Sequence, residues 1–89
     1  MRINEDFIKT DMGKEVILIP LGNKGKYKNG VFDLNETGEK IYDLLEAGKN
    51  ANEIVDILAA EYSDDRAVIA GYVDEFIAKL LEAKILIDD

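Results

Sequence analysis

The sequence of 89 residues contains no cysteine and no histidine. Without cysteine, disulfides, thiolate metal sites and thiol nucleophiles are excluded, and a reducing cytoplasm is the expected location. Without histidine, the chain lacks the side chain that most often acts as an acid–base catalyst near neutral pH and as a nitrogen ligand for transition metals. Most hydrolytic and zinc chemistry is therefore excluded, and we expect neither a metal site nor a cofactor.

Long hydrophobic runs are also missing. No segment approaches the roughly 20 apolar residues of a membrane span, and the start of the chain, residues 1–6, lacks the apolar stretch of a signal peptide. The 19 acidic and 11 basic side chains give a formal net charge of −8, which repels nucleic-acid backbones and anionic lipid. We expect an unprocessed, soluble protein that binds no nucleic acid and no membrane and whose partners are neutral or basic.

Three short strands are predicted early in the chain, at residues 7–12, 16–19 and 31–34. The middle run is β-branched and apolar on both faces, which is typical of a central strand. The stretch 22–30 is rich in glycine and asparagine and predicts a long hairpin connection. In the third strand, the alternation directs Phe32 and Leu34 toward the core and leaves Val31 and Asp33 on the other face.

Three helices are predicted after the strands, because the spacing of apolar residues changes from two to about 3.6. Asn35 caps the first helix, which Gly48 ends, and the second helix opens with a capping box. Either Ser63 or Asp64 caps the third helix, which has the strongest periodicity and is expected to organise the core. Its apolar positions recur every three or four residues: Ile69, Tyr72, Val73, Phe76, Ile77, Leu80 and Leu81.

The order of these elements predicts an α+β fold of the winged helix-turn-helix type, with a three-stranded antiparallel sheet at the N-terminus followed by three helices. No linker, repeat or low-complexity segment is visible, so we expect one domain over residues 1–89. The tail Ile85-Leu86-Ile87 forms either a short strand or an extended segment, and the sequence does not decide between them.

The order and spacing of these signals resemble the PqqD family over residues 5–87. The resemblance rests on three motifs and an upstream block: Leu34-Asn35-Glu36-Thr37-Gly38; Ile41-Tyr42-Asp43-Leu44-Leu45 with Gly48 after it; Leu80-Leu81 before Ala83-Lys84-Ile85-Leu86; and Phe7…Gly13…Val16-Ile17-Leu18-Ile19-Pro20. At the closing turn, Lys84 stands where the family commonly has a glycine, and we expect this difference to affect only the helix cap.

The resemblance implies a precursor-peptide recognition element of ribosomal peptide natural product biosynthesis. Such a protein is not an enzyme; it binds a leader peptide and presents it to a separate modifying enzyme, such as a radical SAM maturase. In that family the leader adds as a strand to the edge of the third strand, beside the third helix. The implied peptide-binding residues of this chain are Lys26, Tyr27, Lys28, Val31, Phe32, Asp33, Leu34, Arg66, Ile69 and Val73.

The energetics of such binding require more than a strand edge. Four main-chain hydrogen bonds contribute about 2–6 kcal/mol in total, whereas micromolar affinity needs about 8 kcal/mol. An adjoining apolar groove has to supply the remainder and offset the ordering of a disordered leader. The third helix would therefore be as necessary as the strand edge.

Plainer interpretations stand beside these assignments. Val31 fits an ordinary sheet residue as well as a contact, Phe32 and Leu34 fit the core, and lysines on a hairpin commonly protect a sheet edge. Two other functions also remain open, a DNA-binding winged-helix regulator and a structural subunit that docks on a larger enzyme. The scarcity of basic residues in the third predicted helix disfavours the first, and the oligomeric state is not decided.

Overall fold

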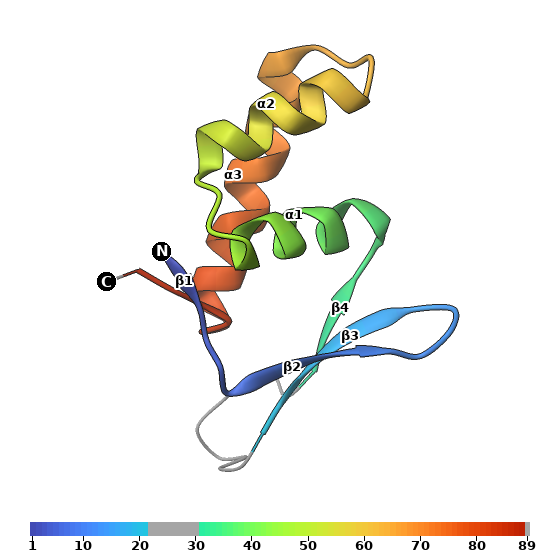
Figure 1. Ribbon diagram of the computed structural model, residues 1–89, viewed down its shortest axis with the longest axis vertical. Coiled ribbons are helices and arrows are strands. Elements are labelled where there is room, and N and C mark those ends of the chain that lie inside the picture. Colours follow the sequence, from blue (N-terminus) through green and yellow to red (C-terminus); the bar gives the residue numbers. More distant parts are fainter. Residues whose placement is uncertain (22–30, 89) are drawn as a thin grey trace.

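The computed structural model describes residues 1–21 and 31–88 of the chain (Figure 1). Strands β2 (Phe7–Asp11), β3 (Val16–Pro20) and β4 (Phe32–Leu34) form an antiparallel sheet in the order β2-β3-β4. This arrangement confirms the predicted three-stranded sheet, with β3 as its central strand and β4 at one edge. The predicted hairpin connection between β3 and β4 lies outside the described residues.

Three helices follow the sheet, as predicted, and complete the α+β fold: α1 (Glu36–Glu46), α2 (Ala51–Glu61) and α3 (Arg66–Glu82). The side chain of Asn35 caps α1 by accepting a hydrogen bond from the N–H of Gly38. The predicted capping box of α2 is confirmed, because Asn50 and Glu53 each accept a hydrogen bond from the backbone N–H of the other. None of the helices in the described part of the chain is long and apolar enough to cross a membrane.

The cap of α3 differs from the prediction by one or two positions. The capping residue is Asp65, whose carboxylate accepts a hydrogen bond from the N–H of Ala67, rather than Ser63 or Asp64. All three residues are of types that cap helices well. The choice among them depends on where the connection from α2 allows the first helical turn to begin, which apolar spacing does not reveal.

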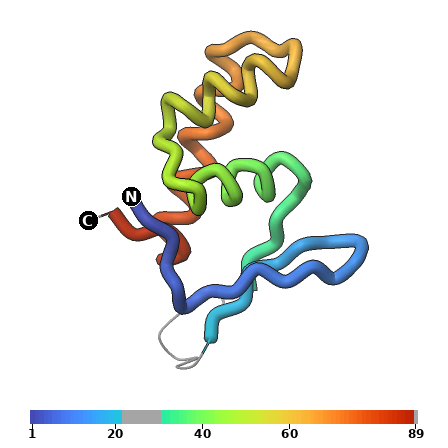
Figure 2. The backbone as a smooth tube through the Cα atoms, viewed as in Figure 1, coloured from blue at the N-terminus to red at the C-terminus, as the bar shows by residue number. Residues whose placement is uncertain are grey.

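The two ends of the chain pair with each other. Strands β1 (Arg2–Ile3) and β5 (Leu86–Ile87) form a second, two-stranded antiparallel sheet, and Figure 2 shows the two ends side by side. The side-chain amide of Asn4 adds a hydrogen bond of 2.8 Å to the carbonyl oxygen of Lys84. The tail is thus a short strand, and its partner β1 was not predicted because two residues are too few to show a period.

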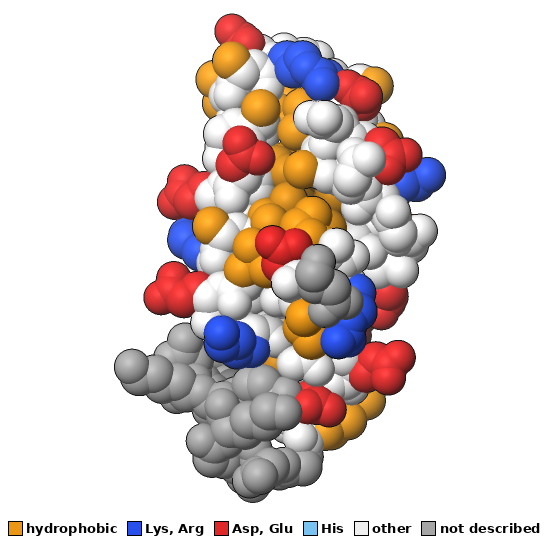
Figure 3. All heavy atoms as spheres, turned by 90° about the vertical axis from the view of Figure 1, so that its left-hand side faces the viewer, with side chains coloured by type: hydrophobic (Ala, Val, Ile, Leu, Met, Phe, Trp, Pro, Cys, Tyr) orange, Lys and Arg blue, Asp and Glu red, His pale blue; other side chains and the backbone are white. Residues whose placement is uncertain are grey.

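The core lies between the three helices and the inner face of the larger sheet. Its fully buried large side chains are Leu18, Ile41, Tyr42, Ile54, Leu58, Val73, Leu80, Ile85 and Leu86. The predicted alternation in β4 is confirmed, since Leu34 is buried and Phe32 is half-buried, whereas Val31 and Asp33 are exposed. On the face that carries both chain ends, hydrophobic side chains reach the surface as a strip flanked by charged groups (Figure 3).

The last turns of α1 and α3 share one backbone geometry but differ at one residue. Each closes with the paired hydrogen bonds that commonly satisfy the last carbonyl groups of a helix. The residue with positive φ is Gly48 after α1 (φ 92°) and Lys84 after α3 (φ 65°). Because a side chain is disfavoured in this left-handed region, the lysine is strained where the glycine is not.

Replacing Lys84 by glycine is therefore expected to stabilise the domain. The relief of left-handed strain exceeds the added backbone entropy of glycine in the unfolded chain by about 0.5–1 kcal/mol. Urea unfolding followed by circular dichroism measures the change. The matched control is Gly48→Ala, which makes the reverse exchange and should lower the free energy of unfolding; an unchanged or lower value for Lys84→Gly would contradict the assigned strain.

Candidate functional site

The candidate site begins at the exposed edge of β4. Within residues 1–21 and 31–88, β4 pairs with β3 alone, in the register Val16 to Leu34, Ile17 to Asp33 and Leu18 to Phe32. A strand paired on one side presents main-chain N–H and C=O groups on its other side, where a further strand can pair. The edge of β4 is thus a site at which an extended peptide could extend the sheet.

A row of three aromatic rings connects this edge to α3. The Phe32 ring meets the Phe76 ring edge-on, with centroids 6.1 Å apart, and the Phe76 ring stacks on the Tyr72 ring at 6.4 Å. Tyr72 and Phe76 also line a small hollow of about 80 Å³ together with Glu75 and Lys79. We call Phe32, Phe76 and Tyr72 the aromatic row; it places an apolar surface of α3 beside the edge of β4.

Gly38 of α1 leaves the space that the aromatic row occupies. A Cβ atom at Gly38 would lie 2.9 Å from Cζ of Phe76 and 3.1 Å from the capping oxygen of Asn35. Both distances are shorter than ordinary van der Waals contacts. The closeness of α1 to the aromatic row therefore requires a residue without a side chain.

Gly38→Ala is expected to lower stability even though alanine is the better helix former. The propensity gain of about 1 kcal/mol is outweighed by overpacking, which costs about 1–3 kcal/mol, because the Phe76 ring has to move against Phe32 or Tyr72. Gly71→Ala in α3 is the matched control, because a Cβ there meets nothing within 4 Å, and it should raise stability. Thermal unfolding of both variants checks the sign, and a stabilised Gly38→Ala would contradict the close packing.

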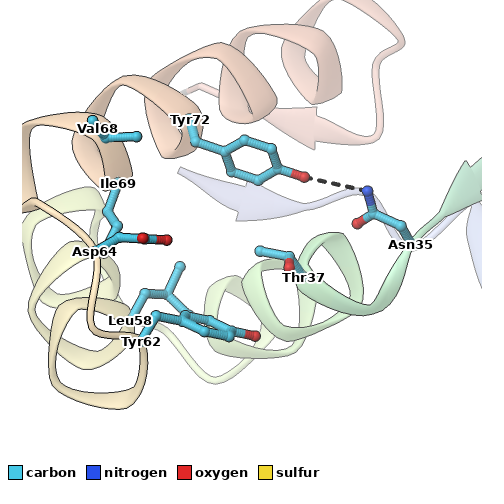
Figure 4. A pocket seen from close by; sticks show the side chains of 8 residues that line it. All are labelled: Asn35, Thr37, Leu58, Tyr62, Asp64, Val68, Ile69 and Tyr72. Carbon is cyan, nitrogen blue, oxygen red and sulfur yellow. Dashed lines mark hydrogen bonds between the residues drawn. The ribbon is translucent and has the colours of Figure 1, made fainter.

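A pocket of about 400 Å³, which we call the helix pocket, continues from the aromatic row toward the start of α3 (Figure 4). The residues that line it come from α1 with its cap, α2, α3 and the connection between α2 and α3: Asn35, Thr37, Leu58, Tyr62, Asp64, Val68, Ile69 and Tyr72. Asn35 lies at the junction, since its amide N–H group donates to the Tyr72 hydroxyl at 3.3 Å while its oxygen caps α1. The pocket is thus mainly apolar and adjoins the Leu34 end of β4.

Two of the described basic side chains beside this pocket, Lys40 and Arg66, form ion pairs. Lys40 pairs with Glu61 and lies 5.0 Å from the centre of the Tyr62 ring. Hydrogen bonds to Glu61 and Tyr62 raise the pKa of Lys40 above its usual value, so this lysine is charged at any physiological pH. Arg66, at the start of α3, pairs with Asp56 at 2.5 Å.

The sheet is held against α1 by Lys9 of β2. Its ammonium group lies 2.7 Å from the Glu39 carboxylate and 2.8 Å from the Asp43 carboxylate. Burial lowers the pKa of Lys9, but hydrogen bonds to Asp43 and Glu39 outweigh it, so the pKa lies above its usual value. These contacts help to fix the position of the sheet, and therefore of the β4 edge, relative to the helices.

A second hollow, of about 470 Å³, is lined by residues of β4 and of the β2–β3 hairpin and has an acidic lining. Acidic side chains dominate its lining, among them Asp11, Glu15, Asp33, Glu36 and Glu39. Within the described part of the chain, no group of three or more acidic side chains is arranged to hold a metal ion. This hollow adds negative charge next to the strand edge and offers no apolar anchor comparable to the aromatic row.

The predicted site residues fall into different surroundings. Val31 and Asp33 are exposed beside or within β4, and Ile69 is buried but lines the helix pocket. Leu34 and Val73 are core residues. Arg66 is exposed and ion-paired, while the assignments at residues 26–28 (Lys26, Tyr27 and Lys28) lie outside the described residues.

Several residues that form the site were not assigned to it from the sequence. Tyr72 and Phe76 were placed on the apolar stripe of the third helix, where they are less buried than Val73 and Ile77. Asn35 was identified as a helix cap, and its second hydrogen bond, to Tyr72, joins residues 37 positions apart. A helical period shows which positions share a face but not which of them border another element.

The chain is similar to a known protein family and to a solved structure. The family model described as "Coenzyme PQQ synthesis protein D (PqqD)" matches residues 15–86. No curated protein matches the chain. A solved structure, "TbiB1 in Complex with the TbiA(beta) Leader Peptide", is similar over 100% of both chains, with 33% sequence identity and a TM-score of 0.80.

Proposed function

This chain belongs to the PqqD family, and we propose that it is a non-catalytic module that binds the leader of a precursor peptide and presents it to a separate modifying enzyme. The similarity to TbiB1 supports this proposal, because the solved structure of TbiB1 is a complex with a leader peptide. A radical SAM maturase stays the candidate enzyme, and the cytoplasmic location expected from the sequence is part of the proposal.

The observation that carries the proposal is the exposed edge of β4 beside the aromatic row. A peptide that pairs with this edge forms main-chain hydrogen bonds worth about 0.5–1.5 kcal/mol each. Side chains on one face of the peptide then meet Phe32 and Phe76, and burial of apolar area there contributes roughly 25 cal/mol per Å². The edge supplies register and the adjoining rings supply affinity, and micromolar binding requires both.

The residues proposed to contact the leader follow from these positions. Val31, Phe32 and Asp33 form the pairing segment, and Ile69, Tyr72 and Phe76 form the wall on α3. Leu34 and Val73 are buried, so we assign them a supporting role behind the groove. Arg66 stays in the proposal as a charged neighbour whose ion pair with Asp56 holds the start of α3 near α2.

A DNA-binding role has less support from the structure. The only basic residues of α3 are Arg66 and Lys79, and each already has an acidic neighbour, Asp56 at 2.5 Å and Glu75 at 3.6 Å. A recognition helix needs free cationic groups to approach phosphates. A salt-sensitive gel shift with generic duplex DNA would nevertheless favour the regulator over the peptide-binding module.

The proposal is tested by titrating the isotope-labelled protein with the precursor peptide encoded next to its own gene. Amide shifts should concentrate at residues 31–35 and along the first half of α3. Strand pairing adds a second signature: N-methylation of the peptide backbone should weaken binding at every other position, because alternate N–H groups of a strand point to its neighbour. Shifts confined to another surface, or no dependence on alternate positions, would contradict strand addition.

A further inference from the structure

We infer that the helix pocket, between α1, α2 and α3, takes a lysine or arginine side chain of the leader. This inference rests on the proposed function and specifies the class of leader side chain that this pocket binds. The basic residue lies on the N-terminal side of the segment that pairs with β4. Antiparallel pairing, as in the rest of the sheet, directs the N-terminal part of the guest toward Leu34 and Asn35, where this pocket opens.

The carboxylate of Asp64 is the first observation behind this inference. Figure 4 shows it pointing into the space between Ile69 and Tyr72 on one side and Leu58 and Tyr62 on the other. Within the described residues Asp64 has neither an ion pair nor a capping role, whereas its neighbour Asp65 caps α3. A mainly apolar pocket that contains one unpaired carboxylate is complementary to a side chain with an apolar stem and a cationic head.

The surrounding charges also favour a cation. Among the described basic groups, Lys40 lies over the Tyr62 ring and Arg66 follows Asp64 by two positions; they are held by Glu61 and Asp56, so neither neutralises Asp64. The last turn of α2, which ends at the pocket, contains no basic residue, and its free carbonyl groups attract positive charge. The positive end of α3 acts in the opposite direction, but the Asp65 carboxylate partly compensates it. The net charge of −8 adds a general attraction for basic peptides.

The Tyr72 ring supplies a second way to hold the cation. Tyr62 and Tyr72 both border the pocket, but the Lys40 ammonium group already lies over the Tyr62 ring, 5.0 Å from its centre, so Tyr72 is the ring that a guest cation can use. A positive group over an aromatic face is attracted by the electrons of the ring. The stem of a lysine or arginine can therefore pack on Leu58 and Ile69 while its head reaches Asp64 between the tyrosines.

A peptide selection tests the inference and does not require the natural leader to be identified. Random peptides displayed on phage are selected against the wild-type chain, Asp64→Asn and Glu82→Gln, the last of which removes a carboxylate from the other end of α3. We expect lysine or arginine to be enriched on the N-terminal flank of peptides selected by the wild type and Glu82→Gln, and this enrichment to disappear with Asp64→Asn. The amide spectrum of each variant confirms that it is folded.

Affinities of one selected peptide then isolate the charge. Replacing its flanking lysine by norleucine keeps the stem and removes the cation, and fluorescence anisotropy should show about a two- to fivefold weaker affinity for the wild type and no change for Asp64→Asn. Selected peptides with an apolar or aromatic flank, or an equal loss for both proteins, overturn the inference and leave the proposed function intact. Failure to select any peptide whose binding depends on the β4 edge overturns the proposed function and the inference with it.

Discussion

Replacing Val31 with proline is expected to weaken leader binding about tenfold to a hundredfold while the domain stays folded. Proline has no N–H group and its ring occupies space beside the chain, so it interrupts main-chain pairing at a strand edge. A donor or acceptor left without a partner costs about 1–3 kcal/mol, which corresponds to this range of affinity. Val31 is 51% exposed and precedes β4, so the substitution removes little packing.

The control for this experiment is Val31→Thr, which keeps the branched shape and the N–H group. Isothermal titration calorimetry with the leader should give the threonine variant an affinity within about twofold of the wild-type affinity, since only a methyl group has been exchanged for a hydroxyl. Circular dichroism of both variants should match the wild type. Equal affinities of the proline variant and the wild type, with native spectra, would place the leader elsewhere on the surface.

Leu18→Ala is expected to have the largest effect on stability, a loss of about 2–5 kcal/mol. Leu18 lies in the central strand, is fully buried and pairs directly with Phe32 of β4. Truncation leaves a cavity between the sheet and the helices that close packing cannot fill. Because small domains are stable by only about 5–15 kcal/mol, the variant should unfold at a markedly lower urea concentration.

The neighbouring substitution Ile17→Ala is the matched control for Leu18→Ala. Ile17 belongs to the same strand but lies on the outer face and is only half-buried, so its truncation should cost about 1 kcal/mol or less. Denaturant unfolding of the two variants gives both values. Equal losses would mean that the outer face of the sheet is packed as tightly as the inner face, contrary to the described structure.

Most of the fold could be predicted from the sequence, because the turn and capping residues and the spacing of apolar residues indicate the same elements. The alternation of Phe32 and Leu34 with exposed neighbours located β4, and the change of period after Leu34 located the helices. The capping box at Asn50 marked the start of α2 correctly, since capping depends on residues only three positions apart. The start of α3 was misplaced because three consecutive residues there suit the same role.

The candidate site was less accessible to sequence analysis because distant segments build it. The aromatic row needs β4 and α3 to meet, and its fit against α1 depends on the absence of a side chain at Gly38. The family resemblance directed attention to β4 and α3, but it did not distinguish Val73, which is fully buried, from Tyr72, which is 41% exposed. Which of the two residues is exposed depends on the orientation of α3 about its own axis, and that orientation follows from tertiary packing.

The pairing of β1 with β5 has a practical consequence for protein engineering. Both strands lie at the left of Figure 1, whereas the start of α1 lies at the right. A tether attached to either strand, or a short linker joining them in a circular permutant, would run along the side remote from the start of α1 and the adjoining edge of β4. The domain can therefore be fused to an enzyme in either order without the linker crossing the surface proposed to hold the guest.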